Sequence, residues 1–109
     1  VVDPRAYELR LQARALSRLR TAEGYTRALE LLQLALAIAP ADAAAWAQLS
    51  GLYSRQADNG LRPIAEGYRL AREAANQALA HDPALAAAHA SLGWIAMSLD
   101  GDLATAARH

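Results

Sequence analysis

Few side chains in this sequence could support catalysis or hold a metal ion. The chain contains no cysteine, which excludes thiolate ligands, thiol nucleophiles and disulfides. The nearest approach to a metal-binding cluster is formed by His81, Asp82 and His89. A break between two predicted helices separates these residues, so they do not share one helical face as the ligands of a helical zinc motif do. We therefore expect no metal and no cofactor, and we interpret His89 as a packing residue.

A second acidic cluster, Asp100 and Asp102 on either side of Gly101, weakly resembles the start of a calcium loop. The remaining ligands of such a loop are missing, so we interpret the segment as a turn followed by a helix cap at Asp102. The sequence also lacks a glycine-rich phosphate loop of the right spacing. These observations predict that the protein is not an enzyme.

Arginines recur every four residues near the start of the chain, at Arg10, Arg14 and Arg18. On a helix this spacing makes one face positive. Such a face could bind an acidic partner or a nucleic-acid backbone. We favour a solvated face on which acids such as Glu8 pair with some of the arginines.

The overall charge balance bears on the choice between these partners. The chain has 11 acidic and 11 basic residues, so its net charge does not attract nucleic acid or anionic lipid. No aromatic side chains interleave with the arginines to stack on bases. We expect a protein or peptide as the partner, and neither nucleic acid nor a membrane.

The elements that position these residues are predicted to be helices. Ala and Leu dominate the hydrophobic residues, Val occurs only at the first two positions, and Phe is absent. This composition favours an all-α fold and argues against a β-sheet. No apolar run reaches the roughly 18 residues needed to cross a bilayer. The length fits a single domain, 1–109, which we expect in the cytoplasm, with the periplasm left open.

An internal repeat organises the chain. The segment from Ala22 to Ala28 resembles the segment from Ala65 to Ala71, and each match ends at a proline, Pro40 or Pro83, an offset of 43 residues. Self-similarity at such a period is typical of stacked helical arrays. The predicted units are repeat 1 (4–40), repeat 2 (41–83) and a partial repeat 3 (84–109).

The predicted helix boundaries follow from the same pattern. Asp42 is expected to cap a helix, Pro63 suits a first helical turn, and the segment 56–62 is expected to be an inserted turn that tolerates deletion. The predicted helices are Pro4–Leu19, Ala22–Ala39, Ala43–Arg55, Ile64–His81, Leu85–Leu99 and a last one that starts near Leu103.

The spacing of large and small residues within repeat 2 gives the chain a family resemblance. Trp46, Leu49, Ser50 and Tyr53 share one helical face, and a stripe from Tyr68 to Ala78 follows on the next helix. Small residues at the matched positions Ser50 and Gly93, and Ala28 and Ala71, would let paired helices approach closely. The pattern resembles the tetratricopeptide consensus, with Tyr7 and His89 at the Trp positions of the other repeats. The resemblance implies stacked antiparallel helix hairpins in an α-solenoid of about two and a half repeats.

A narrower resemblance covers most of the chain. The segments 3–7, 62–68 and 82–94 occur in this order in the C-terminal tetratricopeptide region of bacterial signalling proteins. In that group the repeats follow an adenylate cyclase, a protein kinase or a winged-helix DNA-binding domain. The resemblance implies that this chain is a regulatory or partner-binding part of a larger protein. None of those effector domains occurs in the sequence, so their activities are not transferred to it.

The resemblance also implies a binding surface, because the first helix of each tetratricopeptide repeat lines a concave groove. The matched positions are Ala44, Ala47, Gln48, Gly51, Ala87, Ala90, Ser91, Trp94 and Met97. This trough of small residues would suit an apolar helix or an extended peptide, unless Trp94 and Met97 are covered by the same protein or by a second subunit. The basic, Asn-rich clamp of chaperone-binding relatives is absent from these positions, which argues against a C-terminal carboxylate as ligand.

The sequence thus predicts a protein–protein interaction module. The alternative is a structural spacer or self-association segment that pairs through an open C-terminal end, where Leu92, Ile95, Ala96 and Leu99 would lie uncovered. A weaker alternative is nucleic-acid binding through the arginine stripe.

Overall fold

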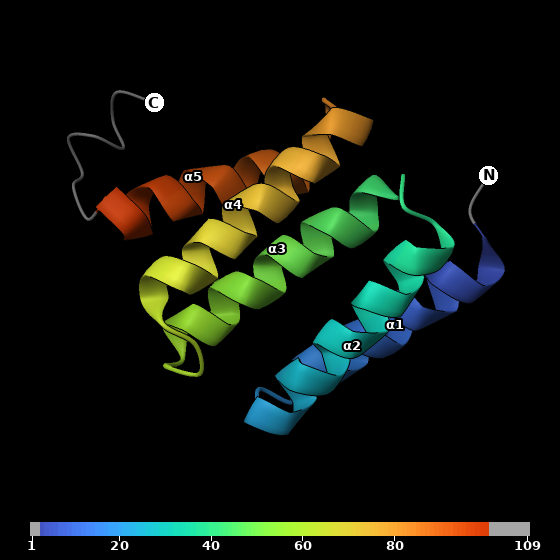
Figure 1. The fold of residues 1–109 in the computed structure, drawn as a ribbon, viewed down its shortest axis with the longest axis horizontal. Coiled ribbons are helices and arrows are strands. Elements are labelled where there is room, and N and C mark those ends of the chain that lie inside the picture. Colours follow the sequence, from blue (N-terminus) through green and yellow to red (C-terminus); the bar gives the residue numbers. More distant parts are fainter. Residues whose placement is uncertain (1–2, 101–109) are drawn as a thin grey trace.

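The structure of this protein, a computed structural model, describes residues 3–100, with the side chains described as far as Met97. Within this part the chain is helical and contains no strand, which confirms the all-α prediction. The helices are α1 (Pro4–Ser17), α2 (Ala22–Ile38), α3 (Ala43–Asp58), α4 (Ile64–His81) and α5 (Ala86–Asp100) (Figure 1). The helix expected to start near Leu103 and the cap expected at Asp102 lie outside the described residues.

Side-chain caps fix where the first three helices begin. The carboxylate of Asp3, the hydroxyl of Thr21 and the carboxylate of Asp42 each accept a hydrogen bond from a backbone N–H in the first turn. These bonds satisfy donors that the helix itself leaves without a partner. The predicted cap at Asp42 is confirmed. Pro63 lies one residue before α4, at the cap position, and not within the first turn as predicted.

Successive helices pack side by side, and the chain reverses direction at each short connection (Figure 1). The pairs α1–α2 and α3–α4 have the most extensive contacts, and α5 packs against α4. In addition, α3 contacts α2, α1 and α5, so it lies between α1 and α5. No described helix combines the length and apolar character needed to cross a membrane.

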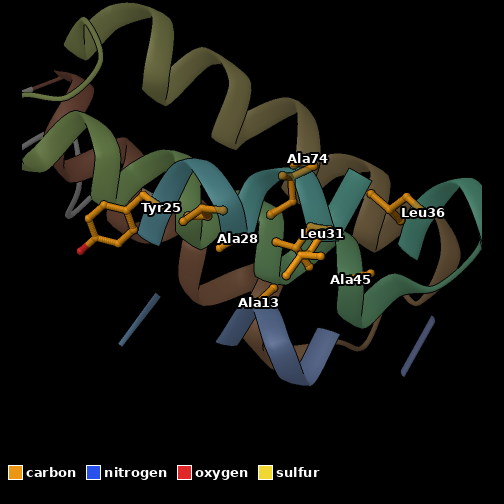
Figure 2. Close-up of a cluster of buried hydrophobic side chains, with 10 residues drawn as sticks. Ala13, Tyr25, Ala28, Leu31, Leu36, Ala45 and Ala74 are labelled. Carbon is orange, nitrogen blue, oxygen red and sulfur yellow. The ribbon is translucent and has the colours of Figure 1, made fainter. Parts of the chain in front are cut away.

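The largest core cluster lies where α1, α2, α3 and α4 meet (Figure 2). It is built mainly from alanine and leucine, with Tyr25 at one end. Because alanine adds little side-chain volume, the helix backbones can approach closely and the leucines fill the remaining space. The labelled members in Figure 2 are Ala13, Tyr25, Ala28, Leu31, Leu36, Ala45 and Ala74.

The 43-residue repeat of the sequence reappears in the contacts. The Trp46 indole N–H donates to the Pro40 carbonyl over 2.8 Å, and Nε2 of His89 lies 2.9 Å from the Pro83 carbonyl oxygen. His89 therefore makes the polar contact of the tryptophan that it replaces, but it is exposed and not packed as predicted. Trp46 itself is only half-buried, where it packs against two core clusters.

The contact between α3 and α4 depends on small residues, as predicted. The Ser50 hydroxyl donates to the Ala71 carbonyl over 2.8 Å, and both residues are fully buried. Gly67 contributes as well, because a Cβ placed there would lie 2.7 Å from Cβ of Ala57. Gly93 is different: no described atom of another residue lies close enough to contact a Cβ added there.

The segment 56–62 is only partly a turn. Helix α3 continues to Asp58, beyond the predicted end at Arg55, and Gln56 is buried. The Gln56 backbone carbonyl accepts a hydrogen bond from the Leu61 N–H, and its side-chain carbonyl accepts one from Arg62 Nε. The prediction that the whole segment is an inserted turn is therefore wrong for residues 56–58, which belong to α3.

Two further predictions about exposed surface need correction. Tyr7 was expected to take the place of a core tryptophan, but nearly half of its surface is exposed. Ile95 was expected on an open face, but it is fully buried against Ala57, Tyr68 and Ala71. Among the described side chains of α5, the exposed large apolar ones are Trp94 and Met97.

Candidate functional site

A hollow of about 540 Å³ lies among α1, α3, α5 and the turn between α1 and α2. Its lining comes from segments far apart in the sequence. The lining residues are Arg10, Arg14, Ser17, Arg18, Arg20, Tyr25, Ala44, Ala47, Gln48, Gly51, Arg55, Leu85, Ala87 and Ser91. We call this hollow the arginine groove.

One wall of the arginine groove consists mainly of small residues from α3 and α5. Ala44, Gln48 and Gly51 form a stripe along α3, and Ser91 joins them from α5. These residues were predicted to line a groove, as were Ala47 and Ala87, and the structure brings all six together. Three other predicted members, Ala90, Trp94 and Met97, do not line it. Trp94 and Met97 are 51% and 46% exposed and continue the surface of α5 beyond Ser91.

The opposite wall carries the arginine stripe of α1. Arg10, Arg14 and Arg18 all line the groove, and Arg20 joins them from the turn that follows. Arg20 has φ of 54°, the only non-glycine residue with positive φ among those described, so the turn holds it in an uncommon conformation. The sequence suggested the basic face and the small-residue trough as two separate surfaces. In the structure they are two walls of one site.

Arg10 is held differently from the other arginines of the stripe. Its Nε lies 3.0 Å from Oδ2 of Asp42, and each of these side chains is less than one-sixth exposed. The Gln48 side-chain amide donates to the Arg10 backbone carbonyl over 2.9 Å. Arg10 therefore joins α1 to the start of α3, and its guanidinium also lies over the ring of Tyr7. The acid predicted to pair with the stripe, Glu8, instead accepts a hydrogen bond from Gln12.

Four groove arginines have no acidic partner within the described part of the chain: Arg14, Arg18, Arg20 and Arg55. No aspartate or glutamate lines the groove. Elsewhere in the described residues, ion pairs three or four residues apart join Arg27 to Glu30, Arg62 to Glu66 and Arg69 to Glu73. The groove thus collects unpaired positive charge on a chain whose formal net charge is zero.

Gly51 leaves open space in the wall of small residues. A Cβ added there would meet only Nη1 of Arg55, at the ordinary contact distance of 3.8 Å. Glycine inside a helix costs about 0.5–1 kcal/mol of stability relative to alanine. Since no described neighbour requires this glycine, packing does not explain it. The missing side chain leaves the groove open next to the Arg55 guanidinium.

Arg55 and Arg20 are the main contributors that sequence reasoning did not assign to the groove. Ala44, Gln48, Gly51 and Arg55 follow one another at intervals of four, three and four residues, which places them on one helical face. Extending the predicted stripe by one turn would therefore have found Arg55. Arg20 carries no such signal, because its position depends on the turn between α1 and α2.

The three residues of the first metal-like cluster, His81, Asp82 and His89, are not gathered into a metal-binding group among the described residues. Among the described residues, no three side chains of the types that bind metals are gathered together. Asp82 accepts a hydrogen bond from the Ala84 N–H, as in a turn. Asp100 and Asp102 have no described side chains.

Comparisons with known proteins identify no relative of this chain. No protein-family model matches the chain, and neither a curated protein nor a solved structure does.

Proposed function

We propose that this chain is a protein-interaction module of the tetratricopeptide type, and that the arginine groove binds a segment of a partner protein. The observation that carries the proposal is the groove itself, in which helices α1, α3 and α5 present a concave surface with one small-residue wall and one basic wall. Concave surfaces built by the first helices of stacked pairs are the usual binding sites of helical repeat proteins.

The repeat contacts support the assignment to stacked helix hairpins. Tyr25 and Tyr68, which are 43 residues apart, are both almost fully buried, and Ala28 and Ala71 are both completely buried. The contacts of Trp46 and His89 with the preceding prolines repeat at the same offset. The role in a larger bacterial signalling protein is supported by the sequence resemblance alone.

Self-association is the second candidate function. It is favoured by the exposure of Trp94 and Met97 next to each other on α5. If a second copy covers them, the mass measured by light scattering rises with protein concentration, and changing both residues to glutamine abolishes the rise. A constant monomer mass would remove this candidate.

Nucleic-acid binding is the weaker candidate, and it rests on the same arginines as the proposed function. It is less well supported because Tyr25, the one aromatic residue of the groove, is 2% exposed. Base stacking requires an accessible ring.

A peptide-display selection tests the proposed function without knowledge of the partner. The folded chain is used to select binders from a library of random peptides, and the binders are then tested on Gly51→Leu. This change fills the groove from a position where a side chain has room. Gly93→Leu is the matched control, since Gly93 also lies in a helix with open space around it but does not line the groove.

The proposal predicts peptides that bind the wild-type chain and Gly93→Leu but lose binding to Gly51→Leu. Circular dichroism should show equal helix content in the three proteins. If no selected peptide distinguishes Gly51→Leu from Gly93→Leu, the groove is not the binding site.

A further inference from the structure

We propose that the arginine groove selects an acidic segment of the partner protein, an inference that rests on the function proposed above. The segment would lie along α1, with its carboxylates on Arg14 and Arg18 and with Arg20 and Arg55 at the far end of the groove. Its uncharged side would face the small residues of α3 and α5.

Ion pairs are unevenly distributed over the arginines. Outside the groove, Arg27, Arg62 and Arg69 each pair with an acid three or four residues away, whereas Arg72 has no acidic partner among the described residues. Inside the groove four arginines lack an acidic partner among the described residues, although acids and bases are equal in number in the whole chain. A surface with unpaired positive charge is electrostatically complementary to a negative partner.

Like charges also follow one another along α1. The helical neighbours of Arg14 at four residues in each direction are Arg10 and Arg18, so like charges follow one another on one face. Like charges at this spacing destabilise a helix by an amount similar to what an ion pair contributes. Of the three arginines, only Arg10 has an acidic partner, Asp42, that offsets this repulsion. A bound carboxylate would relieve it at Arg14 and Arg18.

The spacing of the arginines along α1 is close to the spacing of alternate side chains in an extended peptide. A helix rises about 1.5 Å per residue, so guanidinium groups four residues apart repeat about every 6 Å along α1. In an extended peptide, alternate side chains on one face repeat about every 6.8 Å. A segment with glutamate or aspartate at every second position therefore places successive carboxylates near successive arginines, and its intervening side chains face the opposite wall.

The composition of that opposite wall favours a peptide over a nucleic-acid strand. Ala44, Ala47, Gly51 and Ala87 present methyl groups and backbone, which are suited to aliphatic side chains. Gln48, Ser91 and Arg55 add polar groups to this wall, but no aromatic ring there offers a surface on which bases could stack. The groove thus combines an anion-binding wall with a wall made mainly of small residues, which matches a peptide whose acidic and apolar residues alternate.

The peptides recovered by the display selection give the first test. Those that depend on Gly51 should be enriched in aspartate and glutamate at alternate positions. If they depend on Gly51 but are neutral or basic, the proposed function stands and the acidic segment is wrong. If none depends on Gly51, the proposed function itself fails.

Fluorescence anisotropy gives the second test, with a labelled ten-residue peptide of alternating glutamate and alanine as the probe. Its glutamine analogue and a thymidine oligonucleotide of twenty nucleotides serve as comparisons. We expect the acidic peptide to bind most tightly, and its affinity to fall as NaCl is raised, because exposed charges are screened.

Charge-matched variants then locate the site. Arg14→Gln with Arg18→Gln removes two charges from the groove, and Arg27→Gln with Arg72→Gln removes two exposed charges from other surfaces. Exposed ion pairs contribute modestly, so the first variant should weaken acidic-peptide binding about three- to thirtyfold, and the second by less than about twofold.

Equal losses in the two variants would overturn the proposal, because binding would then depend on net charge and not on the groove. Binding of the glutamine analogue as tight as that of the acidic peptide would also overturn it. Tighter binding of the oligonucleotide, lost in the groove variant, would reassign the groove to nucleic acid.

Discussion

At the scale of single residues, two helical glycines differ in what lies beside them. Gly51 on α3 borders the arginine groove, and a Cβ there has room. Gly67 on α4 faces α3, where a Cβ would lie 2.7 Å from the Ala57 Cβ and 3.3 Å from the Tyr53 carbonyl oxygen. One glycine keeps a surface hollow, and the other lets two helices touch.

The same substitution should therefore have opposite effects at these two sites. Gly51→Ala should raise the free energy of unfolding by about 0.5–1 kcal/mol, because alanine restricts the unfolded chain and favours helix. Gly67→Ala should lower it by about 1–3 kcal/mol, because neither the Ala57 methyl nor the Tyr53 backbone can move away without shifting α3. Urea unfolding followed by circular dichroism measures both. Changes of the same sign would contradict the assignment.

Asp42 has two roles, as the cap of α3 and as the partner of Arg10, and substitution can separate them. Asp42→Asn preserves capping but removes the charge, so it leaves the largely buried Arg10 guanidinium without an acid. We expect a loss of about 1–3 kcal/mol in unfolding free energy. Asp42→Ala should cost about 1 kcal/mol more, because the cap is lost as well.

A second change at Arg10 checks this interpretation. In the background Arg10→Met, Asp42→Asn should lower the free energy of unfolding much less than in the wild type, because no buried guanidinium is left without an acid. An unchanged cost in that background would show that the ion pair does not connect α1 to α3.

At the scale of elements, the connection between α3 and α4 combines a buried part and an exposed part. Gln56 and Ala57 are buried in the last turn of α3, whereas residues 59–61 are exposed. The Asp58 carboxylate accepts a hydrogen bond from the Tyr68 hydroxyl of α4. The end of α3 therefore belongs to the α3–α4 interface.

Two replacements of equal length separate these parts. Changing residues 56–58 to Gly-Gly-Ser should lower the free energy of unfolding by at least about 2 kcal/mol, through lost helix propensity, burial and hydrogen bonds. Changing residues 59–61 to Gly-Gly-Ser keeps Gly60, whose φ is +70°, and should cost less than about 1 kcal/mol. Comparable losses in thermal melts of the two proteins would show that the exposed residues matter as much as the buried ones.

The helices themselves could be predicted well from the sequence, because they depend on signals between residues that are close together in the chain. Composition, caps and spacing placed α4 at its observed ends and the others within a few residues. The extra turn of α3 was missed because Asp58, Asn59 and Gly60 carry a strong turn signal, whereas the burial of Gln56 and Ala57 depends on the rest of the fold. Tertiary packing overrode the local signal there.

At the scale of the whole molecule, the arginine groove arises from contacts between distant parts of the chain. Arg10 meets Asp42 and Gln48, which lie more than 30 positions later in the sequence. The arginine stripe and the small-residue stripe were each visible in the sequence, but no local pattern places them on facing walls. The same limit explains why Glu8 was expected as a partner of the stripe and Asp42 was not.

An NMR titration of the isotopically labelled chain with the alternating glutamate–alanine peptide tests directly whether the arginine groove binds an acidic segment. We expect the largest backbone amide shifts at residues lining the groove, including Arg14, Arg18, Gly51 and Ser91. The amides of Gly93 and Arg72 should change little, and the glutamine analogue should produce smaller shifts throughout. Shifts centred on α2 or α4, or on Trp94 and Met97, with the groove residues unaffected, would show that the peptide does not bind in the groove.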